Sequence, residues 1–195
     1  MKKLFCIESD WDCSPKKEKT ILPLLECIKG VYPEFEYIYR TANTEDELIY
    51  CLKKFKTIRK CSTDFYTIVF CGHGKTGKLT IGDERNSTEL TLKKLAELCE
   101  SVDTQLFSGQ HVHFDSCSVL RTTDARLSQF LESTGAVAIS GFSKKVDFIM
   151  SYALEMILFE SLITSKKIMS ALKRFESKNS ELCMINEFKV FNGVN

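Results

Sequence analysis

Residues 65–71 constrain the fold of this chain more than any other segment. They read Phe-Tyr-Thr-Ile-Val-Phe-Cys, an almost unbroken run of aromatic, β-branched and apolar residues. A run of this length without polar alternation is typical of a strand that is covered on both faces. The segment therefore predicts a central strand of a parallel sheet, and such a sheet needs helices on both of its sides.

Shorter strand-like runs alternate with helical patterns along the rest of the chain. The other runs are 4–7, 35–39, 111–114, 136–139 and 188–191, and a small hairpin is expected around 79–81. The helical patterns cover 20–28 (ended by Gly30), 44–55, 92–99, 127–131 (capped by Thr122 or Thr123), 146–163 and 166–176. This alternation predicts an α/β fold with a mostly parallel sheet of about six strands.

Composition narrows the class of protein. The chain has 195 residues, 44% hydrophobic and 27% charged, which fits one globular domain spanning 1–195. Its 27 basic and 26 acidic residues leave a net charge of +1, so no bulk attraction to nucleic acid or to an anionic membrane is expected. Residues 1–10 hold too short an apolar run for a signal peptide, and 148–159 is too short and too polar to span a bilayer.

The cysteines indicate a reducing compartment. There are nine of them, an odd number without any C-x-x-C pair, which fits neither a disulfide framework nor a zinc site. We therefore expect a cytoplasmic protein in which most cysteines, such as Cys6, Cys71 and Cys99, are small buried hydrophobes.

Two of the predicted strands are followed by residues that can carry chemistry. Gly-His-Gly follows the strand at 65–71, and Asp-Ser-Cys follows the strand at 111–114. Carboxyl ends of neighbouring parallel strands meet at one edge of a sheet, so His73 and Cys117 are expected side by side. We assign Cys117 as a nucleophile and His73 as its general acid and base. The backbone N–H groups of Gly74 and Cys117 are expected to stabilise an oxyanion, and a following helix N-terminus to favour the thiolate.

These motifs resemble those of caspase-like cysteine peptidases, in particular the metacaspase, clostripain, separase and CHAT branches. The His also lies 44 residues before the Cys, near the spacing of about 50 in caspases. The resemblance implies a caspase-like three-layer αβα sandwich and a cysteine endopeptidase that works through a thioester acyl-enzyme without metal or cofactor. The chain departs from these branches in the residues 118–121 that follow the Cys and at Lys144, where separase and CHAT proteins carry an aromatic residue.

The resemblance also implies a substrate preference. Metacaspases and clostripain-like peptidases place an acidic residue two positions before the Cys, in the pocket for a basic P1 side chain, and Asp115 holds that position. Asp147, in the loop after the strand at 136–139, is a second candidate for this pocket. A buried carboxylate favours Arg or Lys by charge and by bidentate pairing. As alternatives, Asp115 could cap a turn, and Asp147 could be the N-cap of the long helix that follows it.

Relatives of this kind imply a protein substrate, a regulatory protein partner and a role in a prokaryotic defence or cell-death pathway. A catalytically silent scaffold that binds a partner is the alternative function. In that case Cys117 would be a core thiol and His73 a loop residue satisfied by backbone groups. His111 and His113 share one strand face and could mimic metal ligands, but no third ligand has a suitable spacing, so we assign them structural roles.

Overall fold

A six-stranded sheet forms the centre of the molecule, in a computed structural model that describes residues 3–12, 19–61, 66–83 and 85–193. The strand order is β2-β1-β3-β7-β8-β9. The strands are β1 (Lys3–Glu8), β2 (Glu36–Thr41), β3 (Tyr66–Cys71), β7 (His111–Asp115), β8 (Ala138–Phe142) and β9 (Phe188–Phe191). All pairings are parallel except that of β9 with β8. The expectation of an α/β fold with a mostly parallel sheet is confirmed.

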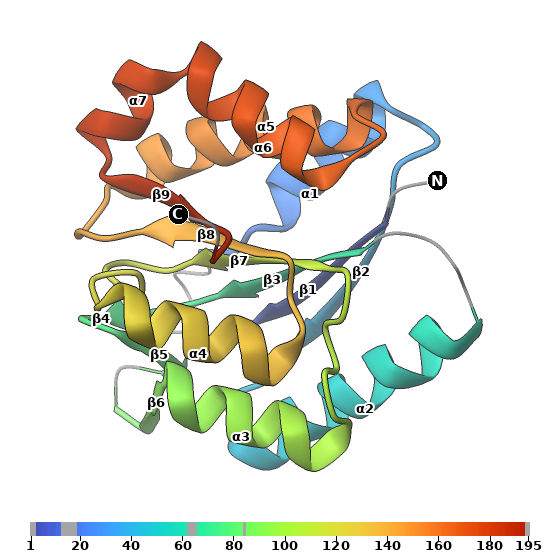
Figure 1. The fold of residues 1–195 in the computed structure, drawn as a ribbon, viewed down its shortest axis with the longest axis vertical. Helices are drawn as coiled ribbons and strands as arrows, with labels where there is room; N and C mark the ends of the chain where they lie inside the picture. The colour runs from blue at the N-terminus through green and yellow to red at the C-terminus, as the bar shows by residue number, and fades with distance from the viewer. Residues whose placement is uncertain (1–2, 13–18, 62–65, 84, 194–195) are drawn as a thin grey trace.

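Helices cover both faces of this sheet and give three layers (Figure 1). One face carries α1 (Leu22–Val31), α5 (Phe148–Thr164), α6 (Ile168–Lys178) and α7 (Ser180–Ile185). The other face carries α2 (Glu45–Cys61), α3 (Leu92–Val102) and α4 (Asp124–Thr134). Each face has its own cluster of buried apolar side chains.

Strand β3 is buried along its whole length, as its sequence predicts. Ile68 and Phe70 pack into the cluster under α2, α3 and α4, whereas Val69 and Cys71 pack into the cluster under α5. Alternation of side chains along a strand explains why both faces need apolar residues here.

Strand β7 differs from β3 because its two faces differ in polarity. Val112 and Phe114 belong to the apolar cluster on the α2–α4 side. His111, His113 and Asp115 take the alternate positions, where the His113 ring meets that of Phe159 from α5 at a centroid distance of 5.7 Å. The carboxyl end of β7 therefore carries a buried polar row on the α5 side.

The segment of the chain between β3 and α3 forms a second, antiparallel sheet. It consists of β4 (Gly74–Lys75), β5 (Lys78–Gly82) and β6 (Ser87–Thr91), in the order β4-β5-β6. The small hairpin expected around 79–81 is thus part of a three-stranded sheet. Its first strand begins directly after His73, which fixes the backbone beside that residue.

Several predicted boundaries are wrong. Strand β8 begins at Ala138 rather than at residue 136, because the Val137 N–H still donates to Gln110 O, outside the β7–β8 ladder. Gly30 does not end α1: its backbone stays helical, and the helix continues to Val31. Helix α7 is not foreseen by the sequence pattern, and residue 65 of the central run lies outside the described residues.

Candidate functional site

The loops after β1, β3 and β7 are joined by backbone hydrogen bonds at one edge of the sheet. The Ser9 N–H donates to Cys71 O at 2.9 Å, and the Gly72 N–H donates to Asp115 O at 3.2 Å. Further along, the Gly77 N–H donates to Ser118 O at 3.1 Å. These bonds bring the segment that carries His73 against the segment that carries Cys117.

A cleft of about 670 Å³ opens at this edge. Its lining includes all four of the predicted side chains, His73, Cys117, Asp115 and Asp147. The carboxyl end of β3, the carboxyl end of β7 and the loop before α5 therefore converge on one cavity.

The His73 ring is oriented by the loop after β1. Its Nε2 atom contacts the backbone carbonyl of Trp11, and because a carbonyl can only accept, Nε2 must carry the proton. Nδ1 is then the basic nitrogen of the neutral ring. The Trp11 indole packs edge-on against the imidazole at a centroid distance of 5.5 Å, and its own N–H donates to Glu8 Oε1 at 2.9 Å.

The role of Trp11 is missed by reading the motifs alone. The only signal in the sequence is position: it is the single tryptophan of the chain and follows the first strand at the same sheet edge. The acidic residues beside it draw attention instead, yet Asp10 is held by Asn43 through hydrogen bonds of 2.8 and 2.9 Å.

Cys117 is half-buried in a turn just beyond β7. Its sulfur accepts a hydrogen bond from the Val146 N–H at 3.5 Å, which supplies a donor for a thiolate. The next residue, Ser118, has φ of 59°, a left-handed conformation that is uncommon outside glycine. The expected helix N-terminus is absent from this point, because α4 begins only at Asp124.

Gly74 allows the two segments to approach closely. An added Cβ would lie 2.2 Å from Cys117 O and 3.0 Å from Cys117 N, so no other residue fits without a shift. His73 O accepts from the Thr80 N–H at 2.8 Å, and the alternation of an antiparallel ladder then turns the Gly74 N–H away from β5. The Cys117 N–H has no acceptor among the described residues. Neither N–H group is therefore engaged by β5 or by the turn, and their role as oxyanion donors stays a prediction.

Asp115 lies at the floor of the cleft and is only 3% exposed. Behind it, the wholly buried Glu155 of α5 brings a second carboxyl close to that of Asp115. Asp115 Oδ2 and Glu155 Oε2 have no hydrogen-bond partner among the described residues. Burial, reinforced by the Glu155 carboxyl, raises the pKa of Asp115 well above its ordinary value, and burial raises the pKa of Glu155 to about 8.

The carboxyl pair continues into the sheet as a chain of hydrogen bonds. His113 Nε2 lies 3.2 Å from Glu155 Oε1, and His113 Nδ1 lies 2.8 Å from Ser140 Oγ, which also meets His111 Nε2 at 2.9 Å. Burial lowers the pKa of His113 to about 4, so the contact with Glu155 joins a neutral imidazole and not an imidazolium. Both histidines are therefore engaged in a buried network, and among the described residues no group of His, Cys, Asp and Glu is placed to hold a metal ion.

Asp147 is the N-cap of α5. Its carboxylate accepts from the Ile149 N–H at 3.0 Å and from the Met150 N–H at 3.3 Å. The capping alternative is thus confirmed, and the side chain is exposed at the rim of the cleft, away from its floor.

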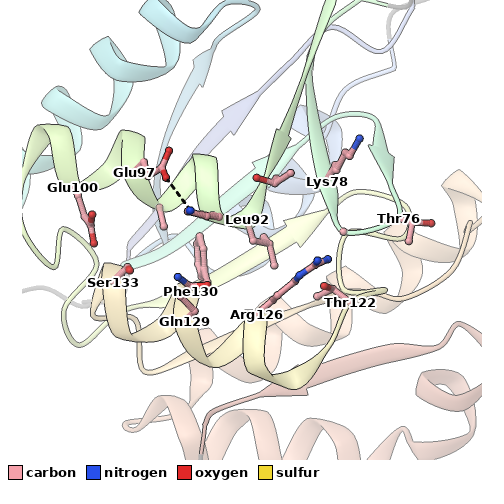
Figure 2. Close-up of a pocket in the computed structure, with 14 residues that line it drawn as sticks. Thr76, Lys78, Leu92, Glu97, Glu100, Thr122, Arg126, Gln129, Phe130 and Ser133 are labelled. Atoms are coloured by element: carbon pink, nitrogen blue, oxygen red, sulfur yellow. Dashed lines mark ion pairs between the residues drawn. The ribbon is translucent and has the colours of Figure 1, made fainter.

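Two further hollows surround this edge. One of about 250 Å³ shares His73 with the cleft and extends past Gly74 along β5 to Asp83 and Ser87. The other, of about 400 Å³, lies between α3, α4 and the β4–β5 turn (Figure 2). Lys93 and Glu97, an ion pair of 3.9 Å, belong to its lining, but neither His73 nor Cys117 does, so it is separate from the candidate site.

Comparison with known proteins identifies the family but not an activity. Residues 1–192 match the family described as "Family of unknown function (DUF6642)", and the chain belongs to this family. No curated protein matches the sequence. A crystal structure of Raptor from Chaetomium thermophilum is similar in fold, with a TM-score of 0.50 and 11% identity. The match covers 95% of this chain and 21% of the Raptor chain, so this chain spans about a fifth of that protein, and the likeness concerns the fold alone.

None of the described helices is both long enough and apolar enough to cross a bilayer.

Proposed function

We propose that this protein is a caspase-like cysteine endopeptidase that cleaves specific proteins after a basic residue. The observation that carries the proposal is the convergence of Cys117, His73 and Asp115 on one cleft, from the ends of adjacent parallel strands. A thiol, a base with a fixed tautomer and a buried carboxyl are the parts that such a reaction requires.

The chemistry begins with transfer of the Cys117 thiol proton to Nδ1 of His73. The thiolate attacks the carbonyl carbon of the scissile peptide, and the N–H groups of Gly74 and Cys117 receive the oxyanion. When the C–N bond breaks, the His73 imidazolium gives its proton to the leaving amine, and a thioester remains. Water then attacks the thioester while His73 takes its proton, and the Cys117 thiol is restored as the acid product leaves.

The preference for a basic P1 residue follows from the depth of Asp115. The two lysines of the cleft, Lys19 and Lys145, are exposed, whereas the carboxyl of Asp115 lies at the floor. A long side chain with a terminal cation can pass the lysines and reach this carboxyl, and a guanidinium can pair with it through two hydrogen bonds.

Active-site labelling tests the proposal. A peptidyl acyloxymethyl ketone with Arg at P1 is expected to modify Cys117 selectively, and the same reagent with Asp at P1 is expected to react much more slowly. Peptide mapping by mass spectrometry locates the adduct. Cys27→Ala, which removes an exposed thiol far from the cleft in sequence, serves as the matched control for Cys117→Ala.

Labelling should be lost in Cys117→Ala and retained in Cys27→Ala. It should fall at least about a thousandfold in rate in His73→Ala, because the thiolate then lacks its base. Modification of Cys27 and Cys117 at similar rates, without dependence on P1, would favour the alternative of a partner-binding scaffold.

We also propose that activity is controlled by a protein partner in the cytoplasm, in a defence or cell-death pathway. Co-purification with Cys117→Ala from the native host tests this, because the variant should retain a substrate that the wild type releases. Recovery of the same proteins with both forms would argue against a trapped substrate.

A further inference from the structure

The reaction described above uses Asp115 but gives no role to Glu155. Glu155 is wholly buried in the middle of α5, a position where a carboxyl costs free energy unless it is neutral or well paired. Its Oε1 atom meets His113, but its Oε2 atom, like Asp115 Oδ2, has no hydrogen-bond partner among the described residues. An unpaired buried oxygen of this kind needs an explanation.

The surroundings of the pair lack a counter-charge. The groups that face it are Glu8 of β1, His113 of β7, Tyr152 of α5 and the thiols of Cys6 and Cys71. Among the described residues, no lysine or arginine forms an ion pair with Asp115 or Glu155. The pair is open to the cleft at Asp115, so a cation can reach it only from outside the molecule.

We infer that Glu155 is a positioning residue for the choice of a basic side chain, and that its carboxyl acts through a proton shared with Asp115. When a guanidinium or ammonium group enters the cleft, the pair releases one proton to water and keeps the other between Asp115 Oδ2 and Glu155 Oε2. The pair loses one positive charge as a proton and gains one as the cation, so the net charge of the buried site does not change. This inference rests on the proposed function, because it assigns the cation to the P1 side chain.

The consequence is that binding of a basic residue depends on pH more than binding of its neutral isostere. Both carboxyls hold their protons more tightly than usual, so cation binding at neutral pH must displace a proton. Glu155→Gln changes this, because an amide carries no charge and can donate to the Asp115 carboxylate. Asp115 then ionises at lower pH, before the ligand arrives.

Calorimetry on the inactive Cys117→Ala protein measures the displaced proton directly. A tetrapeptide amide ending in Arg is titrated at pH 7 in two buffers of different ionisation enthalpy. The expected release is about one proton in the Cys117→Ala protein and close to zero when Glu155→Gln is added. Glu160→Gln is the matched control, since Glu160 is an exposed carboxyl on the same helix, and it should leave the release unchanged.

Kinetics separates positioning from a merely structural effect. In the wild type, KM for a P1-Arg peptide should fall about tenfold per pH unit up to the midpoint of the titration, whereas KM for the P1-citrulline peptide should stay flat. Glu155→Gln should lower the midpoint by at least about one pH unit, with kcat at high pH within about twofold of the wild type. Damage to the fold would instead change both peptides at every pH.

The outcomes keep the inference separate from the proposed function. Binding of the Arg peptide without proton release, or an unchanged midpoint in Glu155→Gln, overturns the inference while Cys117 labelling still supports a peptidase. Failure of the Arg peptide to bind also overturns it. If Glu155→Gln does not fold, Asp115→Asn replaces it, and loss of both proton release and the preference for Arg over citrulline is then the expected result.

Discussion

The five residues of β7 divide between two faces that serve different purposes. On the α2–α4 side, Phe114 stacks on Phe70 at a centroid distance of 5.6 Å within an apolar cluster. On the α5 side, the alternate positions carry His111 and His113, which are hydrogen-bonded to Ser140 and Glu155, and Asp115, whose carboxyl lies near that of Glu155. One face holds the strand in the sheet, and the other connects the buried interior to the cleft.

The difference shows where this fold can accommodate chemistry. Buried polar groups are tolerated when they bond to each other, and here a chain of them leads to Asp115 in the cleft. The apolar face can then carry most of the stability, because a hydrogen bond between buried groups contributes little net free energy and Asp115 Oδ2 and Glu155 Oε2 have no partner among the described residues.

Truncation on each face tests this division most strongly. Phe114→Ala should lower the free energy of unfolding by about 3–5 kcal/mol, since it leaves a cavity between Phe70 and Phe130. Ser140→Ala should cost less, about 1–3 kcal/mol, by leaving His111 Nε2 and His113 Nδ1 without a partner. Urea denaturation measures both, and equal losses would show that the polar face supports the fold as much as the apolar one.

Beyond the end of β7, a close approach of two backbone segments takes the place of side-chain packing in holding the site together. Gly74→Ala places a methyl group against Cys117 O and should reduce the labelling or cleavage rate about a hundredfold by displacing one segment from the other. Gly30→Ala is the control, because it is helical with open space around it and should instead stabilise the protein by about 0.5–1 kcal/mol. Full activity in Gly74→Ala would contradict the close approach.

The polar face also predicts a dependence of stability on pH. Glu155 has a folded pKa of about 8, above its unfolded value, so its contribution is present at low pH and is lost as the pH rises toward 8. His113 has a folded pKa of about 4, below its unfolded value, so its contribution is present above pH 6.5 and is lost as the pH falls. Between pH 4.5 and 6.5 the two slopes oppose each other.

Above pH 6.5 the histidine slope is gone, and Glu155 alone should lower the free energy of unfolding by about 2 kcal/mol between pH 6.5 and 8, while the raised pKa of Asp115 acts in the same direction. Denaturation at a series of pH values checks this. Glu155→Gln should flatten the decline and Glu160→Gln should not. A decline that persists in full in Glu155→Gln would place its cause elsewhere.

Features of the fold and the site could be predicted from the sequence where a pattern within one segment is enough to recognise them. Strand β3 was predictable because its apolar run needs no partner to be recognised, and so was the meeting of His73 and Cys117 at one edge. Strand β8 was misplaced by two residues because both its true and its expected start are apolar.

The supporting parts of the site were not predictable in the same way. Glu155 lies on a helix whose apolar surroundings favour plain core, and nothing local shows that Asp115 is its partner. The Trp11 carbonyl and the Val146 N–H act through the backbone, which leaves no mark on residue type. Such contacts depend on how distant loops meet, so they require the structure.

The smallest expected effect concerns the residue after Cys117. Ser118 adopts a left-handed backbone in which its N–H donates to Lys144 O and its carbonyl accepts from Gly77 and Arg121. Ser118→Gly removes the steric cost of that conformation and should raise the free energy of unfolding by up to about 1 kcal/mol, whereas Ser118→Val should lower it. Thermal unfolding compares the two. If Ser118→Gly destabilises the protein as much as Ser118→Val does, the serine side chain itself stabilises the turn. The loop beyond β7 is then held by side-chain contacts, as β7 itself is.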